Sequence, residues 1–177
     1  MLSTGGVCRM KAVIVAEEVC VAERLTEKLI ERFENKVSFG VVSLQGDLIG
    51  KIKEKSPELL LTVDLSGFNR VTLTDNIAYN LFDCKQLHII CSEDLQNEKV
   101  LETPLSIAMF FACSNAEQCD KLRECYPHIP WLTCMKDWST KEEICSNENV
   151  AAIVEMLEIV MTECFNYWKN NLIHATY

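Results

Sequence analysis

The sequence lacks several features that would place it in a special class of protein. It contains no run of about 18 uncharged apolar residues, the length that a membrane-spanning helix needs. Its first ten residues contain no apolar core like that of a secretory signal peptide. With only 4 prolines it has no proline-rich linker, and it shows no internal repeat or low-complexity tract. These absences predict a cytoplasmic protein without a membrane span.

Positive charge is also scarce. The chain has 17 Lys and Arg against 26 Asp and Glu, a net charge of −9, which argues against a nucleic acid or an anionic membrane as its main partner. An apolar content of 49% over 177 residues fits one globular domain. We predict a single α/β domain over residues 10–177. Residues 1–9 are expected to be a disordered extension, because Met10 directly precedes the first apolar run.

The cysteines do not form a recognisable metal-binding pattern. None of the 10 stands in a CxxC pair, and the closest neighbours are separated by five residues, unlike the usual zinc knuckles. Several lie in apolar runs, such as residues 110–113 and 131–134, where a thiol packs as a small apolar group. We predict buried, reduced thiols and no metal, with a redox pair as the alternative.

Apolar runs typical of buried strands alternate with amphipathic helical patterns. The first helical pattern places Val21, Leu25, Leu29 and Phe33 at four-residue spacing on one face. A long C-terminal helix is expected over about residues 140–172, interrupted or restarted at residues 146–149. The predicted strands are 11–16, 37–44, 57–65, 85–91, 105–113 and 130–135, and the other predicted helices are 46–56, about 74–84 and 115–126.

This alternation is typical of βαβ units with right-handed crossovers. It predicts an α/β fold, a three-layer α/β/α sandwich with a mostly parallel sheet of five or six strands, Rossmann-like or flavodoxin-like. One connection leaves two alternatives open. Residues 92–104 carry no clear helix, so the fourth and fifth strands are either parallel across a short helix or an antiparallel pair.

In such a sheet, ligands bind beyond the carboxyl ends of the strands. The first of these ends carries Glu17 and Glu18 where a dinucleotide or flavin site needs glycines to wrap a phosphate. No GxxxxGK(S/T) motif occurs either, so no NAD, FAD, FMN or P-loop cofactor is expected. The alternative is that both acids only favour the start of the helix electrostatically. The strand-end segments are residues 17–20, 45–47, 64–69, 92–94 and 113–115.

The segment VDLSGFN, residues 63–69, is the most informative of these. Asp64 at a strand end, followed by Ser66 and Gly67, predicts a tight turn with free backbone donors beside a carboxylate. The alternative is an ordinary Asx-type turn with Gly67 at positive φ. Ser66 lacks a GxSxG elbow, so a hydrolase triad is not supported. His88 alternates within a strand pattern and is predicted to be a core histidine.

Three segments carry a resemblance to a known family: KAVIVAEE (11–18), SPELLLTVDLSGFN (56–69) and KQLHIICSED (85–94). The chain from Lys11 to Asp94 resembles the N-terminal, acceptor-side half of GT-B glycosyltransferases, most nearly the lipid-A-disaccharide synthase group. Two features depart from that group: the glycine-rich loop after the first strand is absent, and so is the half that binds the sugar nucleotide.

The resemblance implies a domain that binds a ligand or partner at the strand ends and is not catalytic alone. It implies a second glycosyltransferase subunit as partner, with Glu17 as general base near an acceptor hydroxyl and Asp64 as the other catalytic candidate. Taken with the strand-end serines, the predicted ligand contacts are Asp64, Ser66, Gly67, Asn69, Ser92 and Ser114.

The alternative is a degenerate receiver-like regulatory or protein-interaction domain. Glu17 and Glu18, then Asp64 and Ser92, fall roughly where receivers hold Mg²⁺, the phospho-acceptor and the switch hydroxyl. Receivers use aspartates in the acidic pair and a lysine after the fifth strand, whereas residues 111–114 read FACS here.

A further alternative needs no ligand. Met156, Ile159, Met161 and Phe165 add apolar surface to the C-terminal helix beyond its core stripe. Such a helix is either buried within its own chain or covered by a second copy, so a homodimer through this helix is the other predicted partner.

Overall fold

The structure, a computed structural model, has an α/β fold with a parallel sheet, as predicted, and is compatible with a Rossmann-like fold. Residues 1–8 of the predicted extension 1–9 lie outside the residues that it describes, and so do the predicted ligand contacts Asp64, Ser66, Gly67, Asn69, Ser92 and Ser114. The described residues are 9–34, 36–63, 65, 73, 76–77, 79–81, 83–90, 109–113, 117, 120, 124, 132–135 and 141–174.

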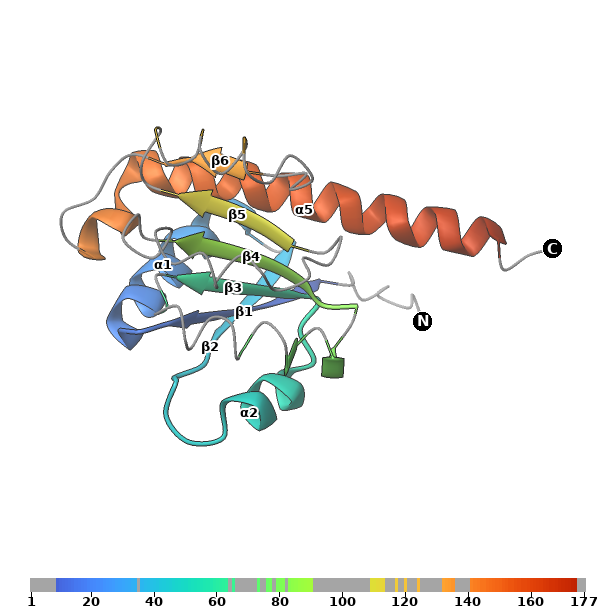
Figure 1. Ribbon diagram of the computed structural model, residues 1–177, viewed down its shortest axis with the longest axis horizontal. Coiled ribbons are helices and arrows are strands. Elements are labelled where there is room, and N and C mark those ends of the chain that lie inside the picture. The colour runs from blue at the N-terminus through green and yellow to red at the C-terminus, as the bar shows by residue number, and fades with distance from the viewer. Residues whose placement is uncertain are drawn as a thin grey trace, which may run out of the picture.

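The strands of the described residues form one sheet of six in the order β2-β1-β3-β4-β5-β6, and every neighbouring pair is parallel (Figure 1). The first five follow the order that flavodoxin-like sheets share. The sequence left open whether the fourth and fifth strands are parallel or antiparallel, and the structure shows that β4 and β5 are parallel. The bounds are β1 Met10–Ala16, β2 Val37–Val41, β3 Leu59–Val63, β4 Lys85–Ile90, β5 Met109–Cys113 and β6 Leu132–Cys134.

The helices follow the predicted pattern. Residues 76–77 and 79–80 are helical, as are 117, 120 and 124, within two further predicted helices, and residue 73, directly before the first of these, is helical as well. The predicted restart near Ser146 is confirmed, because a short 3-10 helix, η3, ends at Cys145 and α5 begins at Asn147. The bounds are α1 Val19–Phe33, α2 Leu48–Lys55, η3 Lys141–Cys145 and α5 Asn147–His174.

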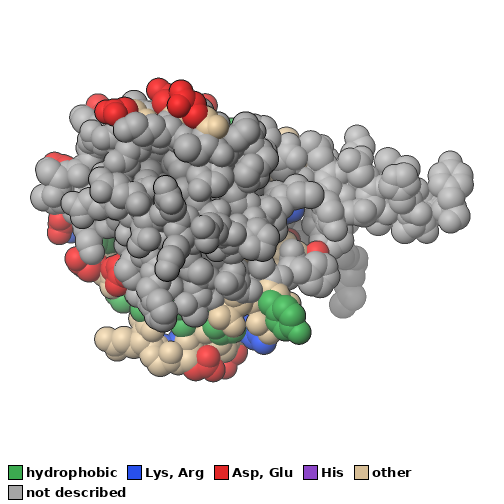
Figure 2. Space-filling view, in the orientation of Figure 1, with side chains coloured by type: hydrophobic (Ala, Val, Ile, Leu, Met, Phe, Trp, Pro, Cys, Tyr) green, Lys and Arg blue, Asp and Glu red, His purple; other side chains and the backbone are tan. Residues whose placement is uncertain are grey.

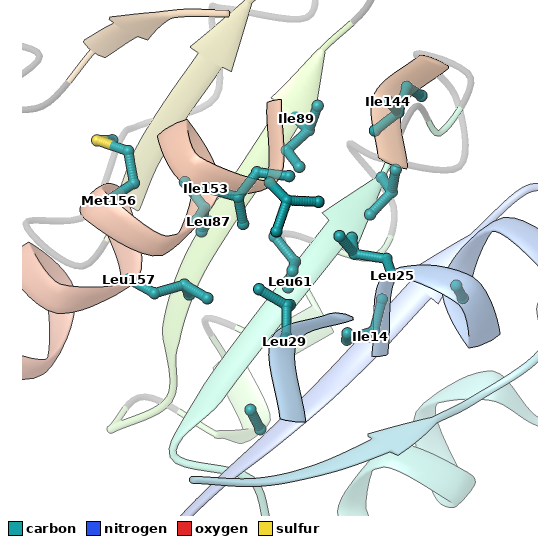
Figure 3. Close-up of a cluster of buried hydrophobic side chains, with 14 of the residues drawn as sticks. Ile14, Leu25, Leu29, Leu61, Leu87, Ile89, Ile144, Ile153, Met156 and Leu157 are labelled. Atoms are coloured by element: carbon teal, nitrogen blue, oxygen red, sulfur yellow. The ribbon is translucent and has the colours of Figure 1, made fainter. Parts of the chain in front are cut away.

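The core consists of two apolar clusters, one on each face of the sheet. Alternation along β1 sends Ala12, Ile14 and Ala16 to one face and Val13 and Val15 to the other. The first face packs against α1, η3 and α5 (Figure 3), and the second against α2 and the helical residues near Leu73. The sheet is therefore the middle layer of three. The predicted apolar face of α1 is confirmed, since all four of its residues are buried.

Helix α5 begins over the sheet and runs past its edge (Figure 1). Met156 is buried, and Ile159 and Met161 are half-buried against the first cluster, so these three side chains contribute to the core of their own chain. The side chain of Phe165 lies outside the described residues, and the homodimer stays a prediction. Among the residues that the structure describes, no helix is long and apolar enough to cross a membrane.

A cap at the start of α2 gives a testable coupling. Asp47 Oδ1 accepts a hydrogen bond from Gly50 N at 2.9 Å, and a Cβ added at Gly50 would overlap the Asp47 carboxylate. We expect Gly50→Ala to leave the free energy of unfolding of the wild type unchanged. The added methyl group displaces the Asp47 carboxylate and breaks its capping hydrogen bond, a loss of about 1 kcal/mol that cancels the better helix propensity of alanine. In an Asp47→Ala background the same change should stabilise by up to about 1 kcal/mol. Urea denaturation of the four proteins measures this coupling, and additive effects would contradict it.

Candidate functional site

The strand order reverses between β1 and β3. From β1 the chain crosses to β2 on one side, and from β2 it returns to β3 on the other side of β1. Ala16 and Val63 are register partners at the carboxyl ends of β1 and β3, so these two strand ends lie side by side. Ligands of open α/β sheets bind at such a reversal. We call the end of β3, the β1–α1 turn (residues 17–18) and the first residues of α1 (19–20) the switch-point edge.

The β1–α1 turn presents carboxylates at this edge. Glu17 is half-buried, and Glu18 is exposed at the N-cap of α1 with extended backbone angles, φ −106° and ψ 116°. The Glu18 backbone carbonyl accepts from Val21 N at 3.0 Å, whereas its side chain makes no capping hydrogen bond. Glu18 Oε2 instead lies 3.9 Å from Cys20 Sγ. The carboxylate of Glu18 therefore does not serve as a side-chain cap for the helix.

Further acidic side chains are visible on the surface of the molecule. In Figure 2 some lie at the left, the side toward which the strand arrows of Figure 1 point, and others lie at the top and bottom. Carboxylates at this edge can accept hydrogen bonds from hydroxyl or ammonium groups and repel phosphate. The described part of the chain holds no group of three or more His, Cys, Asp or Glu side chains that could bind a metal ion.

Of the other strand-end segments, residues 45–47 are accounted for by local structure. Gly46 has a φ of +72°, a conformation that favours glycine, and Asp47 caps α2. The Lys51 ammonium donates to the Gln45 carbonyl at 2.6 Å and lies 3.5 Å from Ser43 Oγ. This segment is therefore an ordinary capped turn. On the β3 side of the switch-point edge, Leu65 is buried and belongs to the second core cluster.

His88 is a core histidine, as the sequence predicts. It is 1% exposed on β4, and its Nδ1 lies 2.6 Å from Oγ1 of Thr62, its register partner on β3, which is 0% exposed. Thr62 and Gln86 were not predicted from the sequence, although both interrupt apolar strand runs. All three alternate with Leu61, Leu87 and Ile89 of the first cluster and therefore face the second side of the sheet. Their burial gives them a structural role.

Comparison of the chain with protein-family models, with curated proteins and with solved structures finds no match. The sheet order and the residues at the switch-point edge therefore carry the functional argument.

Proposed function

We propose that this protein is a ligand-binding domain that holds a hydroxyl-rich, uncharged molecule, such as a saccharide, at the switch-point edge and does not complete a reaction alone. One observation carries the proposal. The strand order reverses beside a turn that presents Glu17 and Glu18 instead of the glycines of a phosphate-binding loop.

The chemistry of these side chains favours an acceptor over an activated donor. A sugar nucleotide brings a pyrophosphate, which two carboxylates repel, whereas sugar hydroxyls donate hydrogen bonds to carboxylates. Glu17 is half-buried, so it is partly shielded from water and suited to act as a general base toward an acceptor hydroxyl. The resemblance to the acceptor-side half of GT-B glycosyltransferases supports the same role and adds Asp64, Ser66, Gly67 and Asn69, which follow β3 in the sequence. A second subunit would then supply the donor site.

We expect a neutral saccharide to raise the melting temperature and its phosphorylated form to raise it much less. A ligand at 100 times its Kd adds about 2.7 kcal/mol of stability, which raises the melting temperature by roughly 5–11 °C for a chain of this size. Glu17→Gln and Asp64→Asn should each weaken binding about 10–100-fold, because each removes a charge-assisted hydrogen bond. A thermal-shift panel of mono- and disaccharides, followed by calorimetric titration, measures both effects.

The matched control is Glu31→Gln, which changes the same kind of side chain at an exposed position in the last turns of α1. It should leave saccharide affinity unchanged. A panel without any saccharide response, or an unchanged affinity in Glu17→Gln, would remove the proposal.

A receiver-like regulatory domain is the second candidate, and the strand order favours it. Receivers share the flavodoxin-like order that β2-β1-β3-β4-β5 follows here. The glutamates after β1 and the absence of a lysine at residues 111–114 count against it. A melting-temperature rise with Mg²⁺ and beryllofluoride that disappears in Asp64→Asn would select this function over saccharide binding.

A further inference from the structure

One cysteine lies in the first turn of α1 and a second contacts that turn, although the two are 125 positions apart in the sequence. Cys20 lies in the first turn of α1 and is exposed. Cys145 is the last residue of η3 and is buried, with its Sγ donating to the carbonyl oxygen of Val21 at 3.7 Å. Because Val21 directly follows Cys20, the buried thiol contacts the residue next to the exposed one.

The contact between α1 and the η3–α5 junction places Cys145 against the first turn of α1, the turn that contains Cys20. Cys20, Arg24 and Lys28 are spaced four residues apart on α1 and therefore share one face. The Lys28 ammonium donates to Asn147 Oδ1 at 3.2 Å, which ties this face to the start of α5. Two hydrogen bonds therefore join α1 to the η3–α5 junction, one from Lys28 to Asn147 and one from Cys145 to the Val21 carbonyl.

The two thiols differ in reactivity. Burial raises the pKa of Cys145 above its usual value of 9.0, while the nearby Arg24 and Lys28 partly offset that rise. A thiol must ionise before it can attack a disulfide. Cys145 is therefore slow to react with an oxidant in solution, and the exposed Cys20 is the thiol that meets one first.

We propose that Cys20 and Cys145 form a thiol–disulfide site that joins α1 to η3 when the protein meets a small-molecule disulfide. In the first step the Cys20 thiolate attacks one sulfur of the disulfide, which forms a mixed disulfide and releases one small thiol. In the second step the Cys145 thiolate, having lost its proton to water, attacks the Cys20 sulfur and releases the other small thiol. The two protein thiols are oxidised, and the small disulfide is reduced to two thiols. This site does not depend on the proposed ligand function.

The test treats the full-length protein with oxidised glutathione, blocks the remaining thiols at low pH and digests with a protease that cleaves after glutamate. Cleavage at Glu18 and Glu23 isolates Cys20 in residues 19–23, and cleavage at Glu143 and Glu148 isolates Cys145 in residues 144–148. Each fragment holds one cysteine, so mass spectrometry identifies the pair directly. We expect the two fragments to be linked, and the oxidised protein to melt at a higher temperature than the reduced protein.

Three variants make the result decisive. In Cys145→Ser, Cys20 should accumulate as the glutathione mixed disulfide, and in Cys20→Ser, Cys145 should stay reduced. Cys84→Ser is the control, because Cys84 is also buried but belongs to the second core cluster, and the link should form in it as in the wild type. Melting curves of the reduced variants verify that each is folded. A wild-type protein in which Cys20 stops at the mixed disulfide, or pairs with another cysteine, overturns the proposal.

Discussion

Replacing Leu25 by alanine is expected to lower the free energy of unfolding by about 2–5 kcal/mol. Leu25 is 0% exposed in the middle of α1, and in Figure 3 it lies among Ile14, Leu29 and Leu61. The shortened side chain leaves a cavity between the helix and the central strands. Those strands are hydrogen-bonded on both sides, so their side chains can move only slightly to fill it. Urea denaturation monitored by circular dichroism measures the loss.

The control is Ile30→Ala on the other face of the same helix. Ile30 is 45% exposed, so its truncation should change the free energy of unfolding by less than about 0.5 kcal/mol. Both variants introduce alanine into α1, so a difference between their free energies of unfolding reports the effect of burial and not that of helix propensity. Similar losses at the two positions would contradict the packing of α1 on the sheet.

Leu25 also illustrates how far the sequence determines this fold. The four-residue spacing of apolar side chains predicts α1 and its buried face, and apolar runs predict the strands, because burial on one or both faces leaves a periodic pattern. Pairing direction leaves no such pattern. The parallel arrangement of β4 and β5 depends on where the chain between them crosses the sheet, and residues 92–104 are polar and irregular.

The order of the strands in the sheet could not be predicted from the sequence either, for a related reason. The buried strands have similar apolar residues, so their composition does not say which lies beside which. The position of β1 between β2 and β3 follows from the packing of α1 on one face of the sheet and α2 on the other. The reversal between β1 and β3 was therefore not predicted.

The candidate site was predicted in part. Strand ends can be located from the apolar runs, which is why Glu17 and Glu18 were placed correctly at the carboxyl end of β1. The hydrogen bonds of individual side chains depend on local backbone angles and on register. The sequence could not show that Asp47 caps its helix while the Glu18 side chain does not, nor that Thr62 lies opposite His88.

The Thr62–His88 pair gives the second large expected effect. Thr62→Val keeps the shape of the side chain but removes the hydroxyl that lies 2.6 Å from His88 Nδ1. Because both residues are at most 1% exposed, water cannot readily replace that hydroxyl. We expect a loss of about 1–3 kcal/mol in the free energy of unfolding, the usual cost of a lost partner at a buried polar group.

A double-mutant cycle distinguishes the hydrogen bond from simple packing. His88→Leu should also destabilise the protein, since it removes the partner of the Thr62 hydroxyl, whereas Thr62→Val combined with His88→Leu should cost much less than the two losses added together. The coupling should reach about 0.5–3 kcal/mol in urea denaturation at neutral pH. Additive losses would mean that the two side chains act separately. A measured coupling would show that this buried hydrogen bond links β3 to β4 on the second face of the sheet. His88 lies two residues before the end of β4 at Ile90. The bond would therefore stabilise the carboxyl-terminal half of the strand next to β3, whose end is part of the switch-point edge.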